Sequence, residues 1–262
     1  MPETQLLHTW LAALGAIAIP ALLYWIASIP LRDASIVDRA WSLLFVAAGL
    51  VYALASGPAK PRVLLTGGLL LAWALRLALH ITVRNWGHGE DRRYQQIRRN
   101  HEPGFALKSL YIVFGLQAVL AWIISLPLLG SMAGDRSLSW RDAPGIALWL
   151  VGFTFEWIGD AQLTRFRARK RSDDAVLDTG LWRYSRHPNY FGECCLWWGF
   201  YLLALSAGAW WTIVAPILMT VLLLRVSGVA LLERDIGARR PAYREYIEHT
   251  NAFVPGPRRA AR

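Results

Sequence analysis

The chain has 262 residues, 55% of them hydrophobic and 14 of them Trp, and its mean hydropathy is +0.31. This composition excludes an ordinary soluble domain and indicates a protein that lies mostly inside a membrane. The formal net charge of +10 does not indicate nucleic-acid binding, because Lys and Arg beside apolar segments usually set membrane topology and contact anionic lipid headgroups.

Apolar stretches long enough to cross a bilayer recur along the chain. They predict an all-α, polytopic membrane protein with seven transmembrane helices. We find no linker, internal repeat or low-complexity segment in the sequence, so residues 1–262 are expected to form a single membrane-embedded helical domain. The predicted spans are 5–29, 35–57, 63–83, 106–130, 143–163, 190–207 and 210–232.

The distribution of Lys and Arg between the loops predicts the orientation. With seven spans, the side that holds the N-terminus carries only Lys60, Arg62, Arg136 and Arg141, and most of the 28 Lys and Arg residues fall on the other side. By the positive-inside rule, the N-terminus is outside and the C-terminus is cytoplasmic. We therefore expect a multi-pass integral protein of a bacterial inner membrane or an equivalent membrane, with its active site toward the cytoplasm.

Polar side chains lie in the cytoplasmic half of several predicted spans. Asp38 and Arg39 open the second span, where they could also form a structural ion pair. Arg76 and His80 share one face of the third span because four residues separate them. Such groups are costly beside lipid and usually mark a functional cavity, so the pattern predicts a polar cavity that opens toward the cytoplasm. The later spans contribute Glu156, Asp160, Asn189, Glu193, Arg225 and Glu233.

The segment 159–193 is the richest in charged and polar groups. A helix that runs to Arg171 is expected to extend past the membrane surface, with Asp160 and Arg167 on one stripe. Guanidinium groups bind phosphates bidentately, which suits a pyrophosphate or a ribose phosphate, although basic helix ends beside membranes also contact lipid alone. After a turn at 179–180, Leu181 and Trp182 are expected to anchor the chain at the membrane interface. Aromatic, hydrogen-bonding and acidic groups that lipid headgroups do not need follow at Tyr184, His187, Asn189 and Glu193.

No metal site and no disulfide framework are expected. The only cysteines, Cys194 and Cys195, are neighbours in a predicted helix and cannot pair in an ordinary disulfide. The sequence contains no Gly-x-Gly-x-x-Gly after a predicted strand and no Walker-type loop, which excludes a soluble dinucleotide-binding fold.

Residues 186–193 (RHPNYFGE), preceded by 179–181 (TGL), resemble the signature of the steroid 5-alpha-reductase C-terminal domain family, in its bacterial membrane branch. The end of the chain, with 233–235 (ERD) and 253–255 (FVP), is also similar to the cytoplasmic tail of that family. The resemblance is specific from about 160 to 255.

This resemblance implies a seven-helix membrane oxidoreductase that uses NADPH to reduce an alkene conjugated to a ketone, as in a 4-ene-3-oxosteroid. It implies substrate-side helices in 1–130 and cofactor-binding helices and cytoplasmic loops in 143–255. Asn189 and Glu193 would then contact the nicotinamide carboxamide, and the arginines the pyrophosphate and the 2′-phosphate. The implied cofactor-binding residues are Asp160, Arg167, Arg171, Tyr184, His187, Asn189, Glu193 and Arg225.

The chain departs from the animal enzymes of that family at the group that polarises the ketone. Those enzymes have Gln-Glu on the second helix and Tyr on the third, whereas this chain has SLLF after Trp41 and His80-Ile81 on the third. Reduction needs a donor that stabilises the developing enolate, and a carboxylic acid in an apolar pocket can keep its proton for this role. The substrate is then a steroid-like enone or another unsaturated lipid carbonyl. The candidate catalytic donors are Asp38, Tyr94, His80 and Glu90, with Asp38 and Tyr94 preferred.

Two other functions are compatible with these residues. Isoprenylcysteine carboxyl methyltransferases, which use S-adenosylmethionine, are similar in the Arg-His-Pro-x-Tyr motif and in acidic residues near Glu233. The arginines favour the reductase, because adenosylmethionine has no phosphate. A non-enzymatic sterol or lipid carrier would keep the cavity without needing Asn189 and Glu193. The expected partners are an apolar small molecule and membrane lipid, not nucleic acid, and the oligomeric state is left open, a monomer included.

Overall fold

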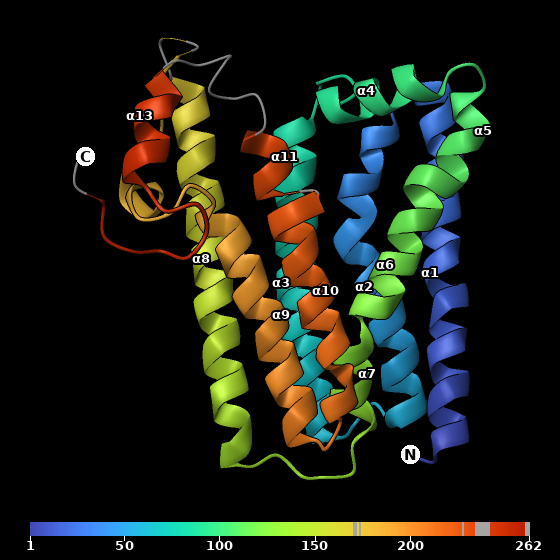
Figure 1. The fold of residues 1–262 in the computed structure, drawn as a ribbon. Coiled ribbons are helices and arrows are strands. Elements are labelled where there is room, and N and C mark those ends of the chain that lie inside the picture. Colours follow the sequence, from blue (N-terminus) through green and yellow to red (C-terminus); the bar gives the residue numbers. More distant parts are fainter. Residues whose placement is uncertain (170–171, 173, 227, 234–241, 260–262) are drawn as a thin grey trace. The chain divides into compact units, whose positions relative to one another are not determined.

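The computed structural model describes residues 1–169, 172, 174–226, 228–233 and 242–259, and every regular element in these ranges is a helix (Figure 1). The chain divides into two compact units. Unit 1 comprises Met1–Leu138 and Leu203–Thr212, and unit 2 comprises Ser139–Leu202 and Ile213–Arg262. All four candidate ketone donors therefore belong to unit 1, and all eight implied cofactor-binding residues belong to unit 2.

Long apolar helices build unit 1, and local sequence explains where several of them begin. The third long helix starts at a proline, whose missing N–H is no loss in a first turn. The short fourth helix starts after Asp91, whose carboxylate accepts a hydrogen bond from the backbone N–H of Arg93. The elements are α1 (Glu3–Leu31), η1 (Ala34–Ile36), α2 (Val37–Ser56), α3 (Pro61–Asn85), α4 (Arg92–His101), α5 (Phe105–Ser109), the π-helical η2 (Leu110–Gly115), α6 (Leu116–Ile124) and α7 (Leu126–Ala133).

The core of unit 1 lies between α1, α2, α3 and the α6–α7 segment. Phe45 and Trp73 are fully buried and meet edge to face with ring centroids 5.6 Å apart. The hydroxyls of Tyr52 and Ser125 are hydrogen-bonded at 2.7 Å between α2 and the start of α7. In a bilayer such bonds replace those that water would otherwise supply, so they help to fix how the helices pack.

The outer faces of the same helices are apolar. Four segments, Glu3–Leu31, Ala34–Ser56, Pro61–Asn85 and Phe105–Ala133, are long and apolar enough to cross a membrane. Leu23 on α1 is 60% exposed and Leu79 on α3 is 65% exposed, and similar side chains follow along both helices. Soluble monomers rarely expose apolar surface on this scale. The chain is thus an all-α protein of the membrane-embedded class, as its composition predicts.

Unit 2 is organised around two long helices, α8 and α9. The described helices α8 to α11 also lie in the ranges of the fifth to seventh predicted spans, and the apolar segment Trp210–Val226 is shorter than the four above. The first long helix continues to Arg169, as predicted, and residues 170 and 171 lie outside the described ranges. The elements are η3 (Trp140–Asp142), α8 (Ala143–Arg169), η4 (Gly180–Arg183), α9 (Pro188–Ser206), η5 (Trp210–Ile213), α10 (Val214–Val221), the π-helical η6 (Leu222–Val226), α11 (Val229–Glu233) and α13 (Ala242–His249).

Glycines let α8 and α9 approach each other closely. A Cβ added at Gly152 would lie 2.5 Å from the carbonyl oxygen of Gly192 and 2.5 Å from the backbone nitrogen of Leu196. A Cβ at Gly192 would lie 2.5 Å from the backbone nitrogen of Glu156. Small residues allow such backbone contact between membrane helices. This packing brings the polar face of α8 against the first turns of α9.

Candidate active site

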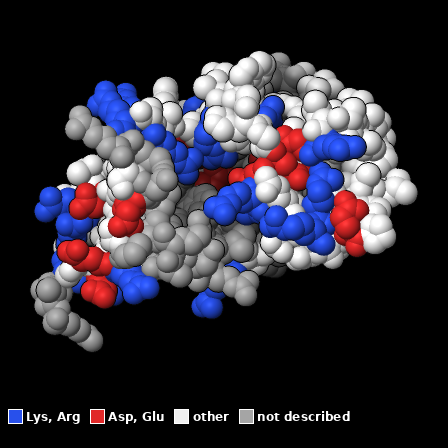
Figure 2. Space-filling model, turned by 90° about the horizontal axis from the view of Figure 1, so that it is seen from above, with Lys and Arg blue, Asp and Glu red and all other residues white. Residues whose placement is uncertain are grey.

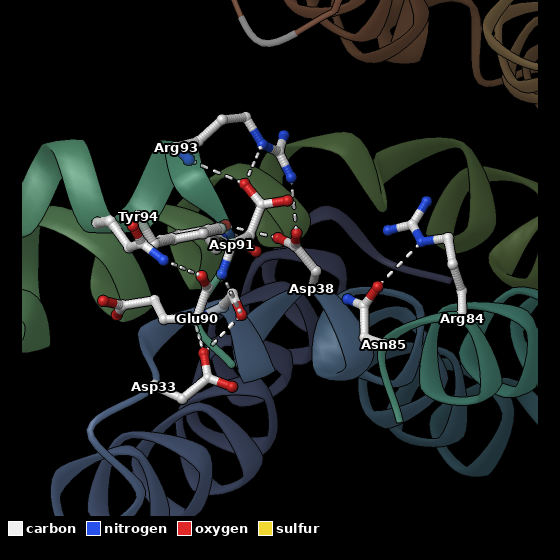
Figure 3. Close-up of polar contacts among 11 residues, drawn as sticks. Asp33, Asp38, Arg84, Asn85, Glu90, Asp91, Arg93 and Tyr94 are labelled. Carbon is white, nitrogen blue, oxygen red and sulfur yellow. Dashed lines mark hydrogen bonds and ion pairs between the residues drawn. The ribbon is translucent and has the colours of Figure 1, made fainter. Parts of the chain in front are cut away.

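A cluster of charged side chains lies at the end of unit 1 where α2 begins and α4 crosses it (Figure 3). The Tyr94 hydroxyl donates to Oδ1 of Asp38 at 2.5 Å, and Arg93 donates to Oδ2 at 3.0 Å. The Tyr94 oxygen in turn accepts a hydrogen bond from Nε2 of Gln117 at 3.1 Å. Tyr94 is only 7% exposed, so this contact is shielded from water. The structure therefore brings together Asp38 and Tyr94, the two preferred ketone donors.

Tyr94 is the donor in the hydrogen bond of this pair. The Asp38 carboxylate receives one donor on each oxygen, from Tyr94 and from Arg93, so it acts here as an acceptor. Burial raises the pKa of the Tyr94 hydroxyl, and the negative charge of Asp38 raises it further. Tyr94 is thus the member of the pair that can donate a hydrogen bond, and Asp38 orients it.

Glu90 links α4 to the start of η1 through hydrogen bonds. Its Oε1 accepts from the backbone N–H of Ala34 at 2.8 Å and from Nη2 of Arg98 at 2.8 Å, and its Oε2 accepts from Nε of Arg98 at 2.9 Å. A carboxylate that accepts hydrogen bonds on both oxygens has no proton to donate. This geometry favours Tyr94 over Glu90 as the ketone donor.

Asp91 holds Arg93 in position. It accepts from both the backbone N–H (2.9 Å) and the Nε (3.0 Å) of Arg93. Burial alone would raise the pKa of Asp91, but the charge and hydrogen bonds of Arg93 outweigh it and lower the pKa. Asp91 is therefore an ionised partner that steers Arg93 toward Asp38.

Further cations surround these carboxylates. Arg84 donates to the side-chain oxygen of Asn85 at 3.0 Å, and Arg39 donates to the Asn85 carbonyl at 3.2 Å. His80 lies one turn before Arg84 on α3 and is half-buried. Figure 2 shows Lys and Arg side chains beside Asp and Glu on the face where α4 lies. His80 stays a candidate donor that these contacts do not test.

In unit 2, the motif loop (residues 182–187) leads into α9 and carries an ion-paired centre. Arg186 pairs bidentately with Glu233, at 2.8 Å from Nε to Oε1 and 2.7 Å from Nη2 to Oε2. Nε2 of His187 lies 2.8 Å from the same Oε1. His187 is 5% exposed, and its ring stacks parallel to that of Tyr190 with centroids 5.6 Å apart. The implied cofactor residue His187 therefore contacts a carboxylate.

Glu233 is ionised at physiological pH. Burial alone would raise its pKa, but hydrogen bonds from His187 and Arg186 outweigh burial and lower the pKa to about 2. The predicted cofactor-binding and catalytic residues include neither Arg186 nor Glu233. The two are separated by 47 positions. No periodic pattern in a sequence indicates such a pair, and only their presence in the two similar motif segments pointed to them.

In the first turns of α9, polar side chains face those of α8. Nδ2 of Asn189 donates to Oδ1 of Asp160 at 3.1 Å. Oε1 of Glu193 accepts from the indole N–H of Trp197 at 3.0 Å. Asp160 and Glu193 are 6% and 7% exposed. The structure thus joins two implied cofactor residues, Asp160 and Asn189, and buries a third beside them.

Other implied cofactor residues are exposed. Tyr184 is 47% exposed, and Arg167 and Arg225 are exposed on α8 and on the π-helical turn η6. Arg171 lies outside the described residues. Exposed guanidinium groups at the end of α8 are accessible to a phosphate, and the chain places Arg165 and Arg169 there too.

Trp182 does not anchor the loop at a membrane interface. It is only 8% exposed, and its indole N–H donates to the Gly159 carbonyl at 3.1 Å. The reason is that η4 folds back on α8, where the backbone N–H of Leu181 also donates to the Gln162 side chain at 3.0 Å. The prediction of an anchor was wrong for Trp182, because its indole is buried against α8.

The residues of unit 2 suit a phosphorylated nucleotide by their chemistry. The exposed arginines of α8 match phosphate oxygens. The half-buried Asn189 and the buried Asp160 offer amide and carboxylate groups to a carboxamide or a ribose. In the described part of the chain, no group of three or more His, Cys, Asp or Glu residues could hold a metal ion.

The chain belongs to a family described as "Protein of unknown function (DUF1295)", which matches residues 6–250. The match runs from α1 to just beyond α13 and so includes both units. An uncharacterized protein of Schizosaccharomyces pombe is 25% identical over 261 residues, covering 88% of this chain and 75% of that relative. No solved structure matches the chain.

Proposed function

We propose that the protein is a membrane-embedded oxidoreductase that uses NADPH to reduce the carbon–carbon double bond of an enone, such as a 4-ene-3-oxosteroid or a related lipid. The observation that carries the proposal is the buried Tyr94 hydroxyl held on Asp38 at 2.5 Å. A protonated hydroxyl, fixed by a charge-neutralised carboxylate in a mostly apolar protein, is a suitable partner for a ketone oxygen.

The proposed topology has seven spans, with the N-terminus outside and the C-terminus and active site on the cytoplasmic side. Its support is that α8, α9 and the Trp210–Val226 segment are helical where the last three spans are predicted. Within unit 1, the α4 end carries most of the cations, and the amino group of Met1 lies at the opposite end, 3.2 Å from Asp135.

Unit 2 would hold the cofactor. In this proposal Arg167 binds phosphate, and Arg171 and Arg225 are further phosphate candidates. Asn189, oriented by Asp160, binds the carboxamide beside Glu193. When bound, NADPH supplies the hydride that is added to the β-carbon of the enone.

Tyr94 would polarise the ketone. Its hydroxyl would turn from Asp38 and donate a hydrogen bond to the ketone oxygen, where negative charge develops as the enolate forms. A proton from water would then add to the α-carbon and complete the saturated ketone. Arg93 keeps the released Asp38 carboxylate paired, and Gln117 keeps the phenol oxygen in place. Each residue of this cluster then has a distinct task, with Tyr94 as the only one that touches substrate.

A second candidate function is methyl transfer from S-adenosylmethionine to an isoprenylcysteine-type substrate. The observation that favours it is the contact of Arg186 and His187 with Glu233, since these residues lie in the segments that resemble both families. The exposed arginines of α8 favour NADPH instead, because adenosylmethionine carries no phosphate.

The test is turnover by the purified protein in detergent. We expect nicotinamide absorbance to fall when NADPH is mixed with a panel of enones, and labelled adenosylmethionine to transfer no methyl group. Methyl transfer without NADPH oxidation would replace the proposal by the second candidate. Binding of enones with neither reaction would indicate a lipid carrier.

A further inference from the structure

The C-terminal tail (residues 242–257) is bound to the motif loop of unit 2 through both its backbone and its side chains. The contacts link residues more than 60 positions apart, and they involve four of the six loop residues. The donor–acceptor pairs are Arg186 N to Asn251 O (2.9 Å), Gly256 N to Tyr184 O (3.1 Å), Ser185 Oγ to Phe253 O (2.7 Å) and the Tyr246 hydroxyl to Trp182 O (2.5 Å).

All three guanidinium nitrogens of Arg186 donate hydrogen bonds, to Glu233 and to the C-terminal tail. Nε and Nη2 bind Glu233, while Nη1 donates to the carbonyls of Ile247 (3.0 Å) and Thr250. Its side chain is 8% exposed. An approaching phosphate would have to displace a carboxylate and two carbonyls, so Arg186 is poorly suited to bind one.

We infer that Arg186, His187 and Glu233 form a latch, which docks the C-terminal tail on the motif loop and thereby positions Asn189 for the nucleotide. In this role the three are positioning residues, and neither Arg186 nor His187 is a phosphate ligand. The inference deepens the proposed function and rests on it for the identity of the nucleotide as NADPH.

The latch sits at the point where α9 begins. The backbone N–H of His187 donates to Oγ of Ser185 at 3.1 Å, and the next residue, Pro188, starts the helix. The backbone of Asn189 then runs against α8, since a Cβ added at Gly159 would lie 3.2 Å from its nitrogen. A loop released from Glu233 would therefore change where the Asn189 amide meets Asp160.

This arrangement separates two kinds of effect on nucleotide binding. Loss of the latch should weaken every nicotinamide nucleotide by the same factor, because the latch acts through Asn189 and the carboxamide that all share. Loss of a phosphate ligand should weaken NADPH more than NADH. The ratio of the two affinities thus distinguishes a positioning residue from a ligand.

Glu233→Gln tests the latch, because the amide keeps the size of the side chain and removes its charge. Without ligand, we expect the backbone amides of Arg186 and Gly256 to exchange hydrogen faster than in the wild type. With ligand, we expect the Kd values for NADPH and NADH both to rise on the order of tenfold. Glu233→Asp should recover part of the loss. Arg167→Gln is the matched control: it should change the ratio of the Kd values and leave exchange of both amides unchanged.

Three outcomes would overturn the inference: unchanged exchange in Glu233→Gln, a rise in Kd for NADPH alone, or a loss of thermal stability with both Kd values unchanged. If Glu233→Gln does not fold, the same measurements are made on Arg186→Lys. This variant keeps the positive charge but cannot pair bidentately with Glu233. Because exchange needs no ligand, a wild type that binds no NADPH contradicts the proposed function, while the exchange data still decide whether the latch exists.

Discussion

The Tyr94 hydroxyl and the Asp38 carboxylate are hydrogen-bonded at 2.5 Å, although 56 positions separate them in the sequence. Arg93, the residue before Tyr94, neutralises the carboxylate from the other side at 3.0 Å. One turn of α4 therefore supplies both a hydrogen-bond donor, Tyr94, and a positive charge, Arg93, to Asp38 in the first turn of α2. This relationship leads to the first prediction.

Tyr94→Phe removes the hydroxyl and keeps the ring in its buried site. We expect kcat for enone reduction to fall by about 100-fold, the loss typical of one oxyanion donor, with the Kd for NADPH unchanged. Asp38→Asn should also reduce kcat without weakening NADPH, because Tyr94 loses its orienting partner. Steady-state kinetics and calorimetry measure both. An unchanged kcat in Tyr94→Phe would contradict Tyr94 as the ketone donor. His80 would then be the next candidate, tested by His80→Gln.

Arg167→Gln should weaken NADPH more than NADH, because a guanidinium favours the additional 2′-phosphate. Arg165→Gln is the matched control: it removes the same charge from a different stripe of α8 and should leave the ratio of the two Kd values unchanged. Calorimetric titrations with each nucleotide give that ratio. Equal ratios in both variants and the wild type would show that Arg167 faces lipid or solvent.

Asn189→Ala and Glu193→Gln should abolish NADPH-dependent reduction. Both side chains lie in the packed interface of α8 and α9, so the amide in Glu193→Gln is the milder change and still accepts the Trp197 indole bond. Circular dichroism establishes that each variant is folded before NADPH oxidation is measured. Retained reduction by folded Glu193→Gln would exclude its charge from cofactor binding.

The ionisation of Glu233 should make the stability of the folded protein depend on pH. Its folded-state pKa of about 2 lies below the ordinary value of 4.5. Its ionisation therefore stabilises the fold above the ordinary pKa, and this contribution disappears as the pH falls toward the folded-state value. The difference in Tm between wild type and Glu233→Gln should shrink across that window. A difference that is constant with pH would mean that the charge of Glu233 does not stabilise the fold.

Gly192→Ala should destabilise unit 2, because the new methyl would lie 2.5 Å from the backbone of Glu156 and push α8 and α9 apart. Overpacking of this kind costs about 1–3 kcal/mol. Gly15→Ala is the control, since nothing lies within 4 Å of a Cβ at that position of α1. Thermal unfolding of both variants measures the difference, and equal Tm values would contradict the close packing.

Local patterns in the sequence predicted what depends on local physics. Apolar runs of bilayer length predicted the four long apolar segments. The arginine-rich stretch after Gly159 predicted a helix to Arg171, and α8 is helical to Arg169, the last residue described there. The sequence likewise predicted that Asn189 and Glu193 share one face of α9, because residues four positions apart lie on the same side of a helix.

Long-range partners could not be predicted from one sequence. No local pattern in the sequence indicated that Glu90 would accept hydrogen bonds from Arg98 and from the N–H of Ala34. Trp182 suited an interfacial anchor by its position, and only the fold of η4 shows that it packs against α8. The roles of the cofactor residues and the seven-span topology stay predictions.

Transfer of deuterium from the cofactor to the steroid is the decisive test of enone reduction. The protein is incubated with NADPH deuterated at the transferred position and a 4-ene-3-oxosteroid, and the product is examined by mass spectrometry and NMR. The account predicts a saturated ketone with one deuterium at the former β-carbon, and loss of this product in Tyr94→Phe. An unreduced steroid in the presence of bound nucleotide, or a reduced product without deuterium, would contradict it.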